Sequence, residues 1–323
     1  MLNIGKENAT LTWQGGDGAI FLDGESVETT ASSPFELKNL NEAVSYTAQV
    51  KNKAGESEKI QFNTKDYDIL VNSKGNADYK SVVEAAKNAE SGMTIKVMPG
   101  TYSGTIKSQG KMLNIIGTDR ATCILKSTDG RYEYPVIDFG YGKLENLTIV
   151  AEYVSGESHE IDSNTTGAYA IHSDDPSATN KKTEIKNCVV RSDFFPALGC
   201  GLRQNYVIDL NSSTLINNQD NGRGGYINQG TLGAVFVHDV AADNITDQNI
   251  NITDCTLKSN KAYALCIHDL GRANSKASIL AINNTLTSSA SGSAIWFRGK
   301  DAWTNTWELD AKSKGNNDAL LNK

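Results

Sequence analysis

Cysteine and proline are scarce in this chain, with 5 of each among 323 residues. The odd number of cysteines and the absence of a Cys-x-x-Cys pair exclude a disulfide framework and a zinc module of the usual spacing. We expect these cysteines to be buried thiols that pack as small apolar side chains. They are Cys123, Cys188, Cys200, Cys255 and Cys266.

The chain also lacks a long apolar run and an excess of positive charge. No segment approaches the roughly 18 apolar residues that a membrane span needs, and the first residues, MLNIGKENATLTW, show neither the basic nor the apolar part of a secretion signal. The formal net charge is −7, whereas binding to nucleic-acid phosphates requires a basic surface. We therefore expect no membrane insertion and no nucleic-acid partner.

Threonine, serine, asparagine and glycine are abundant, and segments that favour helix are few, so the composition indicates a mainly β protein. Within residues 1–65, apolar and polar residues alternate in short stretches that are separated by turn-forming pairs such as Asp23-Gly24. This alternation and spacing predict a small antiparallel β-sandwich. The stretches are TLTW, AIFLDG, FELKNL, YTAQVKN and KIQFNT.

One part of this block, FELKNLNEAVSYTAQVKNKAGES, resembles a fibronectin type III domain. Leu40 stands six residues before Tyr46, where that family has its tyrosine corner, and Trp13 stands where the family has a core tryptophan. The first strand of that family is short here. The resemblance implies a spacer or a binding module, and residues 1–65 contain no group of residues that indicates catalysis.

Residues 78–91 form an amphipathic helix in our prediction, with valines and alanines on one face, Asp78 as the N-cap and Gly92 as its end. The next segment, MTIKVMPGTYSG, reads as a strand that enters a Pro-Gly turn. Together this helix, strand and turn resemble the start of the pectinesterase branch of the pectin-lyase-like proteins. The resemblance implies that residues 66–323 form a right-handed single-stranded parallel β-helix, a solenoid that this helix caps at its N-terminal end.

A repeated phrase supports the solenoid. Five segments each have an apolar residue, two polar or turn-forming residues, a small residue and a return to apolar residues: LENLTI, IKNCVV, LNSSTL, ITDCTL and AINNTL. Equivalent residues of successive coils stack on one another in a solenoid. We therefore predict that Leu147, Cys188, Ser213, Cys255 and Asn284 occupy the same place in successive coils.

A second repeat ends in histidine or arginine. The phrases YAIH, CGLR, VFVH, LCIH and IWFR recur at intervals of roughly 30 residues, which predicts one strand position on successive coils, with Asp138 as an earlier member. Because strand residues alternate between faces, Tyr169 and the aliphatic residues are predicted to point inward. The predicted outward residues are His172, Arg203, His238, His268 and Arg298 in one column, and Ala170, Gly201, Phe236, Cys266 and Trp296 in the other.

The outward residues suit a carbohydrate ligand. Aromatic rings pack against the C–H surfaces of sugars, while histidine and arginine supply hydrogen-bond donors and arginine grips carboxylates. The residues predicted to contact an anionic polysaccharide or cell-surface glycan are His172, Arg203, Phe236, His238, His268, Trp296 and Arg298. The alternative interpretation is that the outer positions of a long sheet simply tolerate polar residues, and the sequence leaves both open.

Catalysis is a separate question, because neighbouring strand residues face opposite ways and His238 and Asp239 therefore form no dyad within a strand. The candidate acid–base residues are Asp174, Asp175, Asp239 and Asp269. The nucleophile motif G-x-S-x-G is absent. The Arg203 coil separates His172 from the later histidines, so we expect no metal and no cofactor.

The resemblance to pectinesterases does not extend to the catalytic motifs of that family. The segment ALGCGLRQN replaces the family's Gln-Asp segment, and Asp209 is the one carboxylate near the place expected for a second catalytic aspartate. We therefore favour a carbohydrate-binding or adhesion module over the alternative, a divergent polysaccharide esterase, lyase or hydrolase. A structural spacer is a third interpretation.

The pairing of two such domains is found in bacteriophage tail proteins and bacterial surface proteins. It therefore implies an extracellular or virion-associated protein, and it leaves a homo-oligomer or a larger tail or surface assembly open.

Overall fold

The computed structural model describes residues 2–131, 134–154, 168–194, 196–218, 233–239, 248–260, 263–268, 277–288, 294–298 and 306–309. All structural statements below concern these residues. The chain divides into two compact units, Met1–Asp68 and Ile69–Lys323, and each is described by itself.

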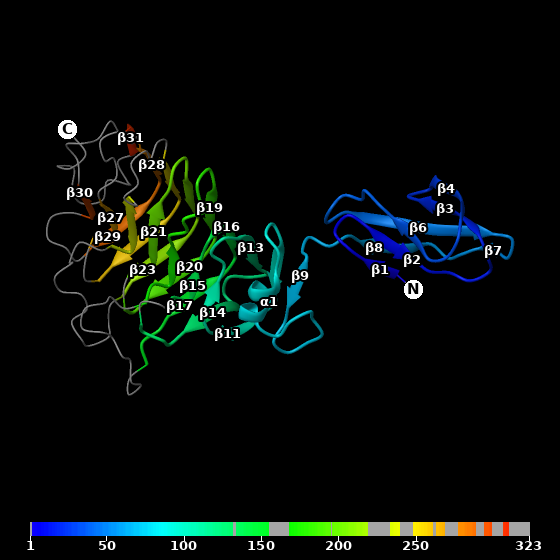
Figure 1. Cartoon of the computed structure of the whole chain (residues 1–323), viewed down its shortest axis with the longest axis horizontal. Helices are drawn as coiled ribbons and strands as arrows, with labels where there is room; N and C mark the ends of the chain where they lie inside the picture. The colour runs from blue at the N-terminus through cyan, green and yellow to red at the C-terminus, as the bar shows by residue number, and fades with distance from the viewer. Residues whose placement is uncertain are drawn as a thin grey trace. The chain divides into compact units, whose positions relative to one another are not determined.

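The first unit is an antiparallel β-sandwich of two sheets (Figure 1). One sheet has the order β1-β2-β5, and the other has the order β4-β3-β6-β7 with β8 paired to β6. Alternating residues of both sheets, among them Ile20, Leu37 and Val50, are buried between them. The strands are β1 (Leu2–Ile4), β2 (Ala9–Leu11), β3 (Gly18–Leu22), β4 (Glu25–Ala31), β5 (Phe35–Leu37), β6 (Ser45–Asn52), β7 (Gly55–Glu56) and β8 (Ile60–Asn63).

Tyr46 and Trp13 stabilise the loops of this sandwich. The Tyr46 hydroxyl accepts a hydrogen bond from the Asn41 backbone N–H at 2.8 Å, and its ring stacks on Phe62 with 5.7 Å between centroids. This contact has the geometry of a tyrosine corner, in which a strand residue holds the preceding loop by its backbone. Trp13 packs against the core and donates from Nε1 to the Gly16 carbonyl at 2.9 Å.

The second unit is a right-handed parallel β-helix in which successive coils add one strand to each of three parallel sheets (Figure 1). The first sheet consists of β9 (Ile69–Val71), β10 (Thr94–Val97), β13 (Met112–Gly117), β16 (Tyr141–Glu145), β19 (Lys182–Lys186), β22 (Val207–Asn211), β25 (Gln248–Thr253), β28 (Ala277–Ile282) and β31 (Thr306–Leu309). The second sheet consists of β11 (Gly100–Ser103), β14 (Cys123–Ser127), β17 (Thr148–Ala151), β20 (Val189–Ser192), β23 (Thr214–Asn217), β26 (Thr256–Ser259) and β29 (Thr285–Ser288). The third sheet consists of β12 (Ile106–Lys107), β15 (Ile137–Asp138), β18 (Ile171–Ser173), β21 (Leu198–Leu202), β24 (Val235–Asp239), β27 (Leu265–His268) and β30 (Ile295–Arg298).

The helix α1 (Val82–Asn88) packs against β9, β10 and β12 at the first coil, as predicted for a cap, but it is shorter than expected. Its N-cap is Ser81, whose Oγ accepts a hydrogen bond from the Glu84 N–H at 3.4 Å. The predicted N-cap, Asp78, was wrong, because its carboxylate instead accepts the Leu70 N–H at 2.8 Å. Lys111 Nζ donates to the Ala89 carbonyl at 2.9 Å, where a cation is favoured by the helix dipole.

The corner between the first and second sheets repeats in five coils. Each corner has two residues, of which the first has a left-handed backbone, with φ between 50° and 59°, and the second is buried. The first residues are Asn146, Asn187, Ser212, Asp254 and Asn283, and short polar side chains tolerate this conformation best. The second residues are Leu147, Cys188, Ser213, Cys255 and Asn284, which confirms the predicted column.

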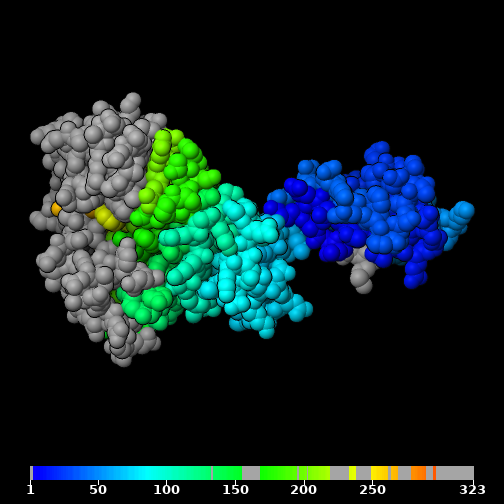
Figure 2. Space-filling view, viewed as in Figure 1, coloured from blue at the N-terminus to red at the C-terminus, as the bar shows by residue number. Residues whose placement is uncertain are grey.

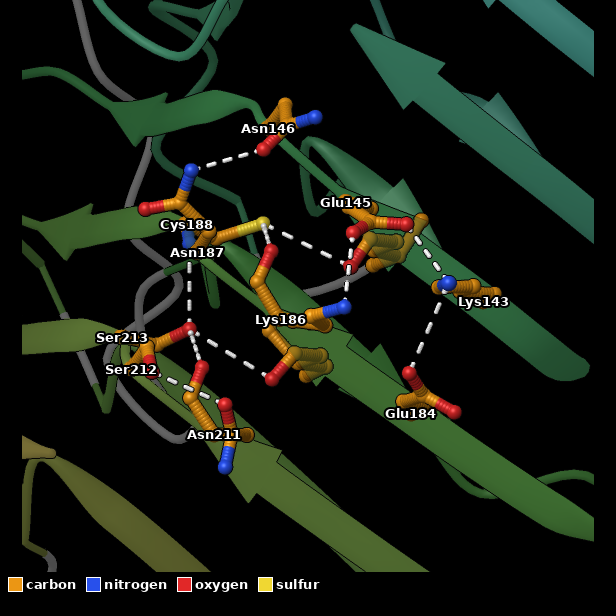
Figure 3. A network of polar contacts seen from close by, with 12 residues as sticks. Lys143, Glu145, Asn146, Glu184, Lys186, Asn187, Cys188, Asn211, Ser212 and Ser213 are labelled. Carbon is orange, nitrogen blue, oxygen red and sulfur yellow. Dashed lines mark hydrogen bonds and ion pairs between the residues drawn. The ribbon is translucent and has the colours of Figure 1, made fainter. Parts of the chain in front are cut away.

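Buried side chains of this column satisfy the backbone of the neighbouring coil (Figure 3). Ser213 Oγ accepts the Cys188 N–H at 3.0 Å and donates to the Asn211 carbonyl at 2.8 Å. Asn284 occupies the same position two coils after Ser213 and accepts a hydrogen bond from the Cys255 N–H at 2.8 Å. Asn187 Nδ2 donates to Asn146 Oδ1 at 2.7 Å on the surface of the same corner.

The cysteines are all buried and unpaired, as predicted. Burial raises the pKa of the Cys188 thiol to about 12 and that of Cys255 to about 11. These thiols therefore stay protonated at neutral pH, where they donate weak hydrogen bonds to backbone carbonyls such as that of Lys186.

Charges of opposite sign alternate on the outer face of the first sheet (Figure 3). Glu145 binds Lys143 at 2.6 Å on its own strand and Lys186 at 3.2 Å on the next coil. Burial by itself raises the pKa of Glu145, but the hydrogen bonds from Lys143 and Lys186 outweigh burial and hold that pKa below its usual value of 4.5. The negative form of Glu145 thus links two coils.

The corner hydrogen bonds predict the effect of Ser213→Ala. Alanine leaves the buried Cys188 N–H without its partner, so we expect the free energy of unfolding to fall by about 1–3 kcal/mol. Urea denaturation followed by circular dichroism measures this change. Thr214→Ala, at the neighbouring half-buried strand position, is the matched control, and equal stability of the two variants would contradict the role of Ser213.

The Glu145 ion pairs predict a pH-dependent stability difference. Because the pKa of Glu145 is lowered by folding, its contribution is complete above about pH 4.5 and is lost as the pH falls through the lower folded-state value. We expect Glu145→Gln to unfold more easily than wild type by about 1 kcal/mol at pH 7, and the gap to close in acid. Urea titrations from pH 7 to pH 3, with the exposed Glu90→Gln as control, measure it. A gap that stays constant with pH would refute the assignment.

Candidate functional site

The strands of the third sheet place one outward residue of each coil in a single file. Their pairing aligns Lys107 with Asp138, Asp138 with His172, His172 with Gly199, Gly199 with Phe236, Phe236 with Cys266, and Cys266 with Trp296. We call these seven residues the outer column. The residues on either side of it along the strands, such as Ile171 and Ser173, are buried in the solenoid.

This register corrects the predicted column of histidines and arginines. His238, His268 and Arg298 do pair with one another as predicted. His172, however, pairs with Gly199 rather than with Arg203, and the partner of His238 is Gly201. The predicted alignment of YAIH with CGLR was therefore wrong by four residues, and an even slip keeps every side chain on its face, so the alternation of apolar residues cannot reveal it.

His172 and Asp138 form a pair across two coils. His172 Nδ1 lies 3.4 Å from Asp138 Oδ1, and the side chains are 17% and 20% exposed. Gln109 Nε2 donates to the same carboxylate oxygen at 2.9 Å. A carboxylate in this position orients the imidazole.

The Tyr169 ring fills the space above Gly199 that a side chain at this position would occupy. The rings of Tyr169 and His172 stack with 5.1 Å between centroids, and a Cβ added to Gly199 would lie only 2.4 Å from Tyr169 Cε1. Tyr169 therefore lies on the outer side of the sheet, and the prediction that it points inward was wrong. It precedes β18, so strand alternation does not govern its direction.

Cations and an aromatic ring surround the first end of the outer column. Lys107 Nζ lies 5.8 Å from the centroid of Tyr134, and the Arg131 guanidinium lies 4.1 Å from the same centroid. Arg131 also forms two hydrogen bonds with Asp129, at 3.0 and 2.7 Å. Lys107 is exposed and lies on the strand next to Asp138.

The predicted carboxylates have partners of their own. Asp174 Oδ1 accepts a hydrogen bond from Arg203 Nη2 at 2.6 Å, so Arg203 lies near the third sheet even though it is not in the outer column. Asp175 is buried, and its oxygens accept the Gly110 N–H at 2.5 Å and both the N–H and the hydroxyl of Ser177 at 2.8 Å. Asp175 thus fixes the turn that carries Gln109.

Burial differs from expectation along the second part of the outer column. Phe236 is half-buried against the core, while Cys266 and Ala170 are fully buried although both were predicted to point outward. Burial also raises the pKa of the Cys266 thiol. The side chains of His238, Asp239, His268, Trp296 and Arg298 lie outside the described part of the chain, as does the whole of Asp269, so their predicted roles stay predictions.

The described part of the site can hydrogen-bond and attract charge. It offers the Lys107 ammonium and the His172–Asp138 pair at the coil spacing of about 4.8 Å. The Gln109 amide and the Arg203–Asp174 pair lie outside this file. Among the described residues, no group of three His, Cys, Asp or Glu side chains is placed to hold a metal ion. No helix among them is long and apolar enough to cross a membrane.

No protein-family model matches the chain, and no curated protein matches it either. Among solved structures, a pectin methylesterase from carrot is similar, with 13% identity, a TM-score of 0.42, and coverage of 79% of this chain and 87% of that one. The pectin methylesterase PemA from Erwinia chrysanthemi has 12% identity, a TM-score of 0.37, and coverage of 78% and 93%. A family 28 exopolygalacturonase from Yersinia enterocolitica has 12% identity, a TM-score of 0.20, and coverage of 97% and 99%. At such low identity the likeness does not extend to individual residues.

The sequence interpretation named His172 but missed several residues around it. Lys107 and Gln109 precede the recognised repeats, and Tyr134 stands before the strand that contains Asp138. A signal for Lys107 was present, because the phrase IK stands 31 residues before ID at Ile137–Asp138. The contact of Tyr169 with Gly199 has no signature in sequence spacing.

The close approach of Tyr169 predicts the effect of Gly199→Ala. The new methyl group would displace the Tyr169 ring from His172, and we expect a loss of about 1–3 kcal/mol in the free energy of unfolding. The same substitution should cost much less in a Tyr169→Ala background, where the space is open. A double-mutant cycle by urea denaturation measures the difference, and additive effects would contradict the contact.

Proposed function

We propose that the chain binds an acidic polysaccharide along the outer column of the third sheet. The observation that carries the proposal is the unbroken file of Lys107, Asp138 and His172 on successive coils. A linear polymer meets such a file at a regular spacing, and each coil contributes one polar contact. Exposed Lys107 attracts a carboxylate, and the imidazole of His172 adds a polar group two coils further on.

The organisation of these groups favours binding over a tolerated polar surface. Gln109 and Asp138 hold the imidazole from one side, and Tyr169 holds it from the other. Fixing a side chain in advance reduces the entropy lost on binding. The first sheet also carries charged outer residues, but Lys186 there is paired with Glu145, whereas Lys107 has no ion-pair partner among the described residues.

The proposal includes a ligand class, a location of the protein and a role for the sandwich. An acidic cell-surface glycan is the ligand class, an extracellular or virion-associated adhesion protein is the setting, and the sandwich is a fibronectin type III-like spacer or binding module. His238, His268, Trp296 and Arg298 extend the ligand contacts beyond the described side chains. A homo-oligomer or a larger tail or surface assembly is compatible with all of these points.

A Lys107→Ala/His172→Ala variant tests the proposal. We expect its affinity for polygalacturonate to fall by about tenfold or more, which corresponds to about 1.4 kcal/mol, because an ion pair and a directed hydrogen bond are both lost. Isothermal titration calorimetry against polygalacturonate and against neutral dextran measures it. Lys258→Ala, an exposed lysine on the second sheet, is the matched control. Unchanged affinity of the double variant would refute the site.

The His172–Asp138 pair also favours one alternative, a divergent polysaccharide-active enzyme. An imidazole oriented by a carboxylate is suited to act as a general base. Such an enzyme would release methanol from methylated polygalacturonate, or new chain ends from the unmethylated polymer, and His172→Ala would abolish the release. If the wild-type protein binds the polymer but releases no such product, the enzyme alternative is refuted and the binding function stands.

A further inference from the structure

The outer face of the five-stranded sheet in the first unit contains a hollow that the solenoid site does not involve. Its volume is about 730 Å³. The side chains that line it include Phe21 from β3, Thr47, Gln49 and Lys51 from β6, and Lys59 and Gln61 at β8. The Asp23–Gly24 turn lines it as well.

Strand pairing explains why these residues meet. Phe21 is opposite Gln49, and Thr47 is opposite Gln61, so two rows of side chains cross the three strands. Residues at alternate positions of the same strands, Ile20, Ala48 and Phe62, face the core and are buried. The Asp23 carboxylate accepts the Thr47 N–H at 2.7 Å and thereby fixes the turn beside the hollow.

Some polar groups of the hollow already have hydrogen-bond or ion-pair partners within the protein, and others do not. Lys51 is paired with Glu56 at 2.9 Å, and its Nζ lies 4.8 Å from the Phe21 centroid. Gln49 Nε2 donates to the Ser57 carbonyl at 3.0 Å. Among the described residues, neither the Lys59 ammonium nor the Gln61 amide has a hydrogen-bond or ion-pair partner.

This combination matches the chemistry of an acidic sugar. A half-buried aromatic ring on an otherwise polar face offers an apolar surface to sugar C–H groups. Planar amides and a hydroxyl suit vicinal hydroxyl groups, since each can both donate and accept hydrogen bonds. A cation without an acidic partner suits a carboxylate. An added peptide strand would instead use backbone groups at a sheet edge, whereas this hollow lies on the face.

We propose that the sandwich contains a second saccharide site, in which Phe21 supports a uronic acid unit, Gln49, Gln61 and Thr47 bind its hydroxyl groups, and Lys59 binds its carboxylate. This inference does not rest on the proposed function of the solenoid, because every residue involved belongs to the first unit.

The test uses the full chain with Lys107→Ala/His172→Ala as background, so that the solenoid site makes no contribution. Trigalacturonic acid is titrated into this background by isothermal titration calorimetry. We expect binding that Phe21→Ala weakens about tenfold, or about 1.4 kcal/mol, and that Lys59→Ala/Gln61→Ala weakens to a similar degree. The Lys59/Gln61 variant changes exposed side chains only, so it decides the matter if Phe21→Ala does not fold.

Matched controls are Lys53→Ala and Asn63→Ala, which remove an exposed lysine and an exposed amide outside the hollow and should leave affinity unchanged. Maltotriose, a neutral trisaccharide, should bind several-fold more weakly than trigalacturonic acid. The inference is overturned if the background variant does not bind trigalacturonic acid, or if the Phe21 and Lys59/Gln61 variants bind like their background. Wild-type binding that disappears in the background variant would support the solenoid site alone, whereas binding that survives there and needs Phe21 would support the sandwich site alone.

Discussion

The solenoid depends on a corner that five successive coils, from β16 to β29, turn in the same way. Two residues connect the first sheet to the second, one left-handed and one buried, in five successive coils. Because this connection keeps the same length in these five coils, the strands on both of its sides stay in register, and the backbone N–H and C=O groups of one coil meet those of the next. The buried hydroxyl of Ser213 and the amide of Asn284 satisfy groups that the turn would otherwise leave unpaired.

A fixed corner on one side leaves the other connections free to vary. Second-sheet strands lead to the third sheet through segments of very different length, from Ser103–Ile106 to Ala151–Ile171. Tyr134 and Tyr169, near Lys107 and His172, come from these variable segments, whereas Gln109 lies on the turn between β12 and β13. The corner between the first and second sheets thus keeps the strands in register, while the segments between the second and third sheets can vary in length and sequence. Functional residues are commonly found on such variable loops of a rigid scaffold.

The sequence was sufficient where a repeat has a constant length. The column of Leu147, Cys188, Ser213, Cys255 and Asn284 was correct residue by residue, because the corner has two residues in each of these coils and the same local pattern marks it each time. The column was wrong on both sides of Arg203, by four residues toward His172 and by two toward His238, because the connections around β21 differ in length and an even slip preserves alternation. The directions of Tyr169 and the N-cap at Ser81 depend on contacts with distant residues, Gly199 and Leu70 among them, that no local pattern contains.

The corner also determines how such a chain can change its length over evolutionary time. A segment that begins at Cys188 and ends before Ser213 closes one full circuit, and both of its ends meet the same turn geometry. Duplicating or deleting such a segment joins equivalent positions and leaves the remaining hydrogen-bond ladders continuous. The protein can therefore grow or shrink by whole circuits without redesign of the scaffold.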